Sequence, residues 1–297
     1  MTILNSPLPN SIRRGTASSV SVRDATKSPP PSPFASLPAI PPSYFKPLCH
    51  PLVDQVSKEV DGYFAERWNF QSPKAKEKFL ATGFSRLTCL WFPKALDDRI
   101  HLACRLVTVL FLIDDILEDL LFEEGSLYYD KLIAICRGDS LPDRSVPAEY
   151  IMLLSALMRF SMGLKITPQE LETVKPIEKN CAKHISVING IYSYEELLVS
   201  KTAHEEGGAF CTSVQIMMGE MDVDAESTKR ILFAMCRERE FRHRMLVAQL
   251  KEESDDTMKV SSALPVYVQG LEYQVSGNEA WCSTSPRYKV AAQKNCQ

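Results

Sequence analysis

Apolar residues recur at helical intervals along most of the chain beyond residue 49. In residues 51–68, Leu52, Val56, Val60 and Phe64 follow one another at intervals of four, so they share one face of a helix. Thr167, followed by Pro168 and Glu170, is typical of a helix start. The same pattern predicts further helices over residues 75–84 (a turn or two), 97–122, 147–164, 167–198, 225–253 and 265–282. Pro176 is expected to kink the helix over residues 167–198.

Composition supports an all-α protein. Twelve glycines in 297 residues are few, and Gly/Asn hairpin signals are nearly absent. A chain that is 45% hydrophobic and 24% charged is typical of a globular domain with a sizeable core. The net charge of −3, without a Lys/Arg block, gives no reason to expect binding to nucleic acid.

Neither a membrane span nor a zinc site is expected. The apolar run "LVTVLFLI" meets four acids within six residues, so it is too short to cross a bilayer. The nine cysteines are scattered without a CxxC pair, which argues against zinc and favours reduced thiols in the cytoplasm.

The N-terminal 44 residues differ from the rest of the chain. They hold nine of the nineteen prolines, many serines and almost no periodic apolar pattern. We therefore expect a disordered tail over residues 1–44 and one helical domain over residues 45–297. Three arginines in the tail leave a targeting peptide open as an alternative, although no amphipathic helix is visible there.

Four carboxylates interrupt the apolar stretch "FLIDDILEDLLF". Asp114 and Glu118 share one face of the predicted helix, and Asp115 and Asp119 share another, because each pair is four residues apart. Buried neighbouring carboxylates repel each other, and a Mg²⁺ ion would remove that cost. The alternative interpretation is that the acids mark the solvent end of a core helix.

Two further polar groups could carry chemistry. In "NGIYSYEELL", Asn189, Ser193 and Glu196 lie on one side of a helix and offer oxygen ligands, although such a face is usually only solvated surface. In "EAWCSTSPRY", Arg287 has the geometry to bind phosphate oxygens, and the ring of Trp281 can stabilise a cation. Together with the acid cluster, these groups predict a helical pocket for a metal–diphosphate.

The sequence resembles the class I terpene (sesquiterpene) cyclases of fungi. The resemblance runs from about residue 45 to residue 288 and is carried by "LCHPLVDQVSKEVDGYF", "FPKALDDRIHLACRLVTVLFLIDDILED", "RGDSLPDRSVP", "LSALMRFSMGLK", "SKTAHEEGG" and "GLEYQVSGNEAW" with the final "RY". It implies an all-α class I terpenoid synthase barrel. It also implies farnesyl diphosphate as substrate, three Mg²⁺ ions and a bicyclic sesquiterpene hydrocarbon as product. Relatives often form homo-oligomers.

The resemblance also assigns roles to individual residues. The metal ligands would be Asp114, Asn189 and Ser193, with Glu196 a displaced candidate for a further ligand. Arg287 and Tyr288 would contact the diphosphate. The cyclisation cavity would be lined by Phe111 and Trp281.

The chain departs from the family in two places. Roughly two to three core helices are missing between "RSVPAEYI" and "LLSALMRF", together with an arginine that senses diphosphate, so we expect an incomplete barrel. In the second metal motif, Gly190 replaces an aspartate and Leu197 replaces the glutamate ligand. These losses support a second hypothesis: an inactive truncated homologue, which could be an interaction protein or the product of a mis-spliced gene.

Overall fold

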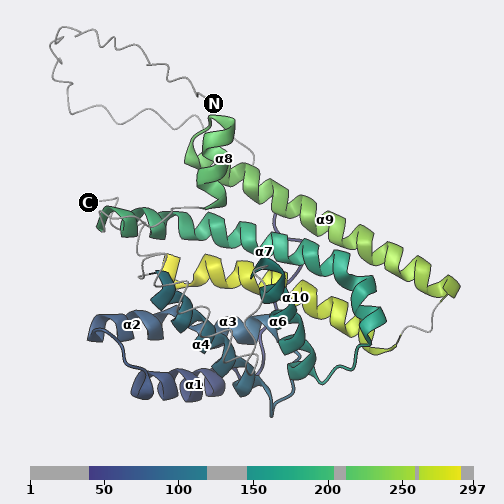
Figure 1. The fold of residues 1–297 in the computed structure, drawn as a ribbon, viewed down its shortest axis with the longest axis horizontal. Helices are drawn as coiled ribbons and strands as arrows, with labels where there is room; N and C mark the ends of the chain where they lie inside the picture. Colours follow the sequence, from purple (N-terminus) through teal and green to yellow (C-terminus); the bar gives the residue numbers. More distant parts are fainter. Residues whose placement is uncertain (1–39, 119–145, 204–211, 258–260, 289–297) are drawn as a thin grey trace, which may run out of the picture. The chain divides into compact units, whose positions relative to one another are not determined.

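A computed structural model describes residues 40–118, 146–203, 212–257 and 261–288 (Figure 1). The chain divides into two compact units, residues 1–39 and 40–297, and the account below concerns the second unit. Most of the expected N-terminal tail therefore lies outside the described residues. None of the described helices is long and apolar enough to cross a membrane.

The described residues form α-helices and no strands, which confirms the all-α prediction. A short 3₁₀ turn, η2 (Pro286–Tyr288), follows the last helix. The helices are α1 (Val53–Arg67), α2 (Pro73–Thr82), α3 (Phe84–Trp91), α4 (Ile100–Glu118), α6 (Val146–Met162), α7 (Pro168–Ala203), α8 (Ser213–Met221), α9 (Ala225–Thr257) and α10 (Ala263–Thr284).

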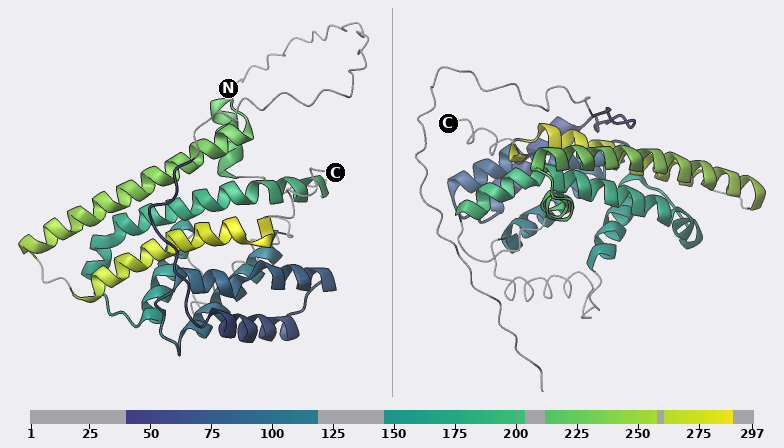
Figure 2. Two further views of the ribbon diagram at one scale, coloured as in Figure 1. Left: turned by 180° about the vertical axis from the view of Figure 1, so that it is seen from behind. Right: turned by 90° about the horizontal axis from the view of Figure 1, so that it is seen from above.

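Helix α10 occupies the centre of the packing. It contacts α7 on one side and α3 on the other, α7 in turn packs along α9, and α3 packs on α4. Figures 1 and 2 show α9, α7 and α10 running side by side. Because α10 has neighbours on both sides, its buried residues are spread round the helix instead of forming one stripe.

A glycine allows α10 to approach α3 closely. A Cβ atom built on Gly277 would lie 2.5 Å from the carbonyl oxygen of Leu90 in α3, a distance that real Cβ atoms do not tolerate. The absence of a side chain at Gly277 therefore sets the spacing between the two helices, and with it the position of η2, which follows α10 directly.

The predicted start of α7 is confirmed in atomic detail. Glu170 accepts hydrogen bonds from the backbone N–H of Thr167 (2.8 Å), and its own N–H donates to the hydroxyl of Thr167 (3.2 Å). Glu170 also accepts from the backbone N–H of Ser261 (3.0 Å), which precedes α10. Hydrogen bonds from Ser261 and Thr167 lower the pKa of Glu170 to about 2.

Two short helices, α3 and α8, were not predicted. Eight or nine residues hold too few turns to display a periodic stripe. Helix α4 also begins at Ile100 instead of residue 97, since residues 95–99 form turns in which Leu96 accepts from the N–H groups of Arg99 and Ile100. Asp97 consequently lies before the helix, 3.7 Å from the buried ring of His50.

A buried charge network holds the start of the described chain against α9. Arg237 pairs with Glu240 and with Glu279 of α10, and its Nε–H donates to the carbonyl of Pro41 (2.9 Å). Glu240 accepts from the backbone N–H of Tyr44 (2.6 Å). Burial alone would raise the pKa of Glu240, but hydrogen bonds from His184 and Tyr44 and the charge of Arg237 lower it.

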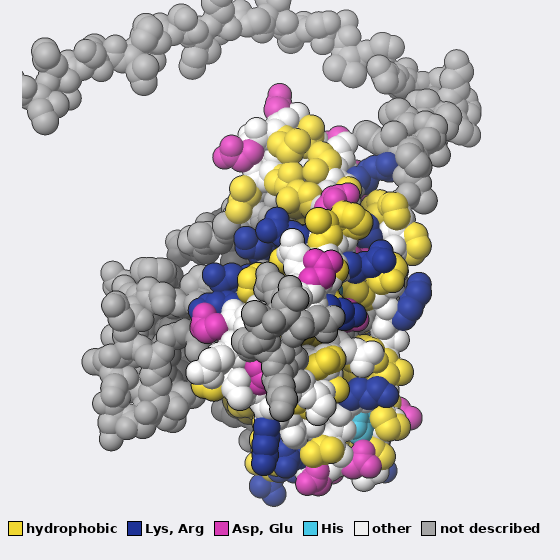
Figure 3. All heavy atoms as spheres, turned by 90° about the vertical axis from the view of Figure 1, so that its right-hand side faces the viewer, with side chains coloured by type: hydrophobic (Ala, Val, Ile, Leu, Met, Phe, Trp, Pro, Cys, Tyr) yellow, Lys and Arg dark blue, Asp and Glu magenta, His cyan; other side chains and the backbone are white. Residues whose placement is uncertain are grey.

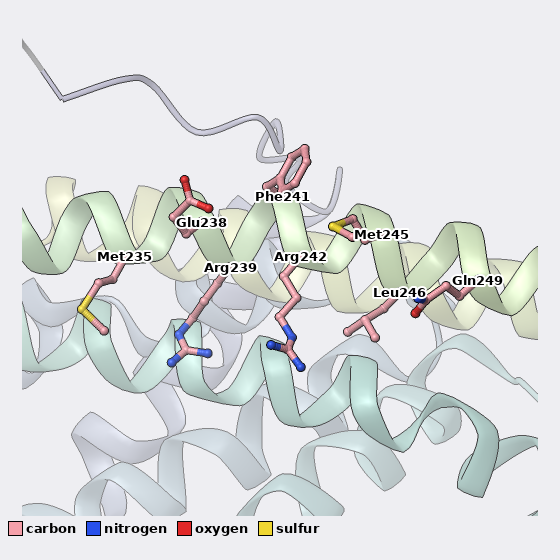
Figure 4. Close-up of a pocket in the computed structure, with 8 residues that line it drawn as sticks. All are labelled: Met235, Glu238, Arg239, Phe241, Arg242, Met245, Leu246 and Gln249. Atoms are coloured by element: carbon pink, nitrogen blue, oxygen red, sulfur yellow. The ribbon is translucent and has the colours of Figure 1, made fainter.

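Large apolar side chains are also exposed. On the face drawn in Figure 3, hydrophobic side chains gather at the upper end, where Figure 1 places α8. Ile216 and Met221 of this helix are 52% and 48% exposed. A second exposed set lies on α9, where Met235, Phe241 and Met245 are 38%, 58% and 50% exposed (Figure 4).

Replacing Gly277 with alanine should destabilise the protein. The added methyl group would overlap the Leu90 carbonyl, and overpacking of this kind costs about 1–3 kcal/mol, more than alanine gains in helix propensity. Gly219→Ala is the matched control, because a Cβ atom on Gly219 in α8 meets nothing within 4 Å and should stabilise by up to about 1 kcal/mol. Urea unfolding of both variants measures the two effects, and equal signs would contradict the prediction.

Neutralising Glu170 should remove a pH-dependent part of the stability. Its folded-state pKa is lowered, so the stabilisation is complete above its ordinary value near 4.5 and is lost as the pH falls towards about 2. Glu170→Gln should therefore lower the free energy of unfolding by roughly 1–2 kcal/mol at pH 7 and by much less near pH 2–3. The exposed neighbour Glu172 provides the control, and Glu172→Gln should change stability by less than about 0.5 kcal/mol.

Candidate active site

The acid cluster lies at the C-terminal end of α4. Protein atoms around the carboxylate of Asp114 raise its pKa by displacing water, and the charge of Asp115 raises it further, while Arg287 lowers it. Part of the Asp114 side chain nevertheless remains open to solvent. A carboxylate that is both crowded by a like charge and accessible is well suited to accept a cation.

Arg287 reaches this cluster from η2. Its Nη1 donates to Oδ1 of Asp115 at 3.1 Å, and its guanidinium lies 6.0 Å from the ring centre of Phe84. The Arg287 side chain is 9% exposed, whereas that of Asp115 is 43% exposed. The structure thus brings together two predicted groups that are separated by more than half of the chain.

Aromatic rings gather next to this ion pair. Phe111 of α4 stacks on Phe84 of α3, with ring centres 4.4 Å apart. Trp281 of α10 lies 6.3 Å from Phe111 and 5.7 Å from Tyr288, and its indole N–H donates to the carbonyl of Thr82 (3.1 Å). That hydrogen bond fixes the orientation of the indole. Trp281 thus joins Phe111 and Tyr288 in one aromatic cluster, whereas the expected roles of Phe111 and Trp281 in a cyclisation cavity and of Tyr288 at the diphosphate stay predictions.

The second motif meets α10. Oδ1 of Asn189 in α7 accepts from the side-chain amide of Asn278 (2.9 Å) and lies 3.5 Å from the thiol of Cys282. Burial, aided by the charge of Glu279, raises the pKa of Cys282 to about 12, so this thiol remains a donor. Because Asn278, Trp281 and Cys282 lie within two turns of α10, that helix links the second motif to the aromatic cluster.

The other residues of the second motif are less well defined. Ser193 is half-buried, one turn beyond Asn189 on α7. The backbone of Glu196 belongs to α7, but its side chain lies outside the described residues. Its assignment as a displaced ligand therefore stays a prediction.

Gly190, which stands where the resemblance expects an aspartate, is covered by α8. A Cβ atom on Gly190 would overlap the hydroxyl of Ser213, the first residue of that helix. The Ser213 hydroxyl is buried and has no hydrogen-bond partner among the described residues. An aspartate at position 190 would need the Ser213 hydroxyl to turn away and α8 to give slightly, because its Cβ would also lie 3.2 Å from the backbone N of Ser213.

Sequence reasoning missed several residues of this site. Phe84 lies on the unpredicted helix α3, and Tyr192, whose ring centre is 6.0 Å from that of Tyr288, looked like ordinary helix core. Asn278 gave no signal in the sequence, because its role depends on the contact with Asn189 of another helix.

Another group of side chains has metal-like spacing but already contains a cation. Donor atoms of His184, Glu240 and Glu279 lie within 4.8 Å of one another. Arg237 pairs with both carboxylates, so its guanidinium supplies the positive charge that a metal ion would otherwise bring. We interpret this group as structural.

Comparison with known proteins decides the family. The chain is 54% identical to aristolochene synthase of Aspergillus terreus, over 84% of this chain and 94% of that one. It is 43% identical to aristolochene synthase of Penicillium roqueforti, over 84% and 88% of the two chains. The chain belongs to the fungal terpene synthases. Its residues 149–242 match the family described as terpene synthase family 2, C-terminal metal binding, a region that includes Asn189 and Ser193.

Solved structures agree with this terpene synthase assignment. The crystal structure of aristolochene synthase from Penicillium roqueforti has a TM-score of 0.67 and 41% identity, covering 83% of this chain and all of that one. Hedycaryol synthase in complex with HEPES has a TM-score of 0.66 at 14% identity, which shows a shared fold alone. The predicted class I terpene synthase fold is confirmed.

The comparison also fits the expected internal gap. The alignment with the Aspergillus terreus enzyme spans 305 positions, although this terpene synthase has 297 residues and 84% of them take part. The relative therefore carries residues that have no counterpart here.

Proposed function

We propose that the chain is a Mg²⁺-dependent sesquiterpene cyclase that ionises farnesyl diphosphate and cyclises it to aristolochene or a related bicyclic hydrocarbon. The cyclase domain would comprise residues 45–297 and act in the cytoplasm. It could form a homo-oligomer, because relatives often associate. The observation that carries the proposal is the contact of Arg287 with Asp115, beside Asp114 and a cluster of aromatic rings.

The donor set fits magnesium. Asp114, Asn189 and Ser193 offer carboxylate, amide and hydroxyl oxygens, the ligands that this hard cation prefers. Asp114 is open to solvent, whereas Oδ1 of Asn189 would have to turn from Asn278 to bind an ion. When bound, three Mg²⁺ ions would neutralise the charge that develops on the departing diphosphate.

Side chains of this chain would bind the diphosphate, stabilise the carbocation and exclude water. Arg287 would exchange its bond to Asp115 for diphosphate oxygens, which a guanidinium binds with two parallel hydrogen bonds, and Tyr288 would contact the same group. The faces of Phe111 and Trp281 would stabilise the farnesyl cation as its positive charge moves. Their burial among apolar neighbours would keep water from quenching it.

The alternative is an inactive homologue. One observation favours it: Ser213 fills the space beside Gly190, where the family carries an aspartate, so that a side chain at this position would need Ser213 to rearrange. Leu197 also stands in place of the family's glutamate ligand. Under this alternative the helical domain would be kept for interaction with another protein, or would reflect a mis-spliced transcript.

Activity should depend on Asp114. Purified protein incubated with farnesyl diphosphate and Mg²⁺ should release a sesquiterpene hydrocarbon detectable by gas chromatography. Asp114→Asn should reduce its rate at least about a hundredfold, because a ligand for the ion that activates the leaving group is lost. The exposed Asp98→Asn serves as the control and should leave the rate unchanged. No hydrocarbon from soluble, folded protein would support the inactive homologue.

Glu196 should matter if it has taken over as a metal ligand. Glu196→Gln would then raise the Mg²⁺ concentration needed for half-maximal turnover about tenfold or more, since a charged ligand is replaced by a neutral one. Glu195→Gln is the matched control, one residue earlier on the same helix. An unchanged Mg²⁺ dependence in Glu196→Gln would reject the displaced-ligand hypothesis.

A further inference from the structure

Two buried thiols meet where α3 packs on α4. Cys89 of α3 and Cys104 of α4 are fully buried, and their Sγ atoms lie 4.0 Å apart. All six cysteines that the structure describes are free thiols, so this pair is reduced at rest. A third thiol, that of Cys49, lies close to the same place.

The contact between α3 and α4 holds the buried pair in position. The Cys104 thiol also donates to the carbonyl of Ser85 (3.6 Å), one turn before Cys89 on α3. Phe111, seven residues after Cys104 on the same face of α4, stacks on Phe84 at the start of α3. The two thiols therefore meet at a fixed point of the interface, about 10 Å along α4 from this aromatic stack.

Cys49 lies between the buried pair and solvent. It is half-buried, whereas Cys89 and Cys104 have no exposed surface. The backbone N–H of His50 donates to the carbonyl of Cys89 (3.0 Å), which places the backbones of Cys49 and Cys89 against each other. Burial raises the pKa of Cys49, Cys89 raises it further and the charge of Arg86 lowers it, so the thiols of Cys49 and Cys89 are also electrostatic neighbours.

Buried cysteines often do no more than fill space in a core. This group differs because two buried thiols are in contact with each other and the third is accessible. An accessible thiol next to a second one is the arrangement in which a cysteine is oxidised and then resolved as a disulfide. Thiol–disulfide exchange can pass the oxidised state on to a further thiol.

We propose that Cys49, Cys89 and Cys104 form an oxidation site for hydroperoxides, in which Cys49 reacts first and the final disulfide joins Cys89 to Cys104. The product is a covalent link between α3 and α4 in the same interface that holds Phe84 against Phe111. The proposal does not rest on cyclase activity.

The oxidation balances in three steps. The Cys49 sulfur forms a bond to one peroxide oxygen as the O–O bond breaks, which gives a sulfenic acid and, with hydrogen peroxide, one water. The Cys89 thiol attacks that sulfur, the S–O bond breaks, and the hydroxyl leaves as water with the thiol proton. The Cys104 thiol then attacks the Cys89 sulfur and its proton passes to Cys49, which is released as a thiol. Two thiols are oxidised by two electrons in all, and one peroxide is reduced.

Oxidation of the full chain tests the end product. An equimolar amount of hydrogen peroxide is added, residual peroxide is removed with catalase, and remaining thiols are blocked with N-ethylmaleimide in denaturant. Trypsin cuts after Lys94 and Arg99, between Cys89 and Cys104, so mass spectrometry of unreduced peptides reports the pairing. We expect a Cys89–Cys104 disulfide that dithiothreitol reverses. The oxidised chain should also unfold at a higher temperature, because the link restricts the unfolded state.

Single variants test the order of the steps. Cys49→Ser should slow formation of the Cys89–Cys104 disulfide at least about tenfold, because the buried thiols then lack an accessible sulfur that receives the oxidant. Cys104→Ala should stop the reaction at a Cys49–Cys89 disulfide. Cys89→Ala should leave Cys49 as a sulfenic acid, which dimedone labels.

Cys236→Ala is the matched control, because it removes another fully buried thiol, on α9, and should leave both the rate and the pairing unchanged. A native chain in which Cys89 and Cys104 stay reduced would overturn the proposal. An oxidation rate in Cys49→Ser equal to that of the native chain would overturn it as well. Neither result depends on the alanine variants at the two buried positions, so the test stands even where those variants do not fold.

Discussion

The ion pair between Arg287 and Asp115 joins the two ends of the candidate site, and the site's electrostatics depend on it. A guanidinium with a nearly buried side chain must be paired, because an uncompensated charge in that position would cost several kcal/mol. Asp115 supplies the partner while its neighbour Asp114 stays free of that bond. A diphosphate could therefore take over Arg287 by exchanging one anion for another, without leaving the arginine unpaired at any stage.

This ion pair requires close packing elsewhere. Arg287 lies on η2, whose position follows from the end of α10, and α10 can approach α3 because Gly277 has no side chain to strike Leu90. The same approach brings Trp281 against Phe111 and Phe84. A backbone contact between two helices thus decides whether the arginine reaches the acids of α4.

The local sequence pattern predicted the long helices and the capping of α7, because both depend on residues close together in the chain. Val56, Val60 and Phe64 form the buried face of α1, and Thr167 and Glu170 form the cap of α7. It could not predict α3 and α8, which are too short for a stripe. Chemistry and family resemblance named Arg287 and the acid cluster, but whether Asp114 or Asp115 receives the arginine depends on the rotation of α4, which tertiary packing sets. Asn278 could not be predicted as a site residue, because its role depends on the contact with Asn189 of another helix.

The altered second motif is coupled to its surroundings. With Ser213 against position 190, glycine is the residue that fits, so the lost aspartate and the place of α8 belong to one arrangement. If the chain is an active cyclase, Asn189 and Ser193 must hold a metal ion beside α8. If it is an inactive homologue, packing against α8 alone explains Gly190.

The rotation of α9 about its own axis follows from buried charge. Glu240 must face inward, because it is 2% exposed and needs Arg237, His184 and the N–H of Tyr44 to offset its burial. At about 100° per residue, Glu238 and Arg242 then lie on the opposite side, each about 160° from Glu240. The network that anchors the start of the described chain therefore also determines which side chains α9 presents to solvent, among them Met235, Phe241 and Met245.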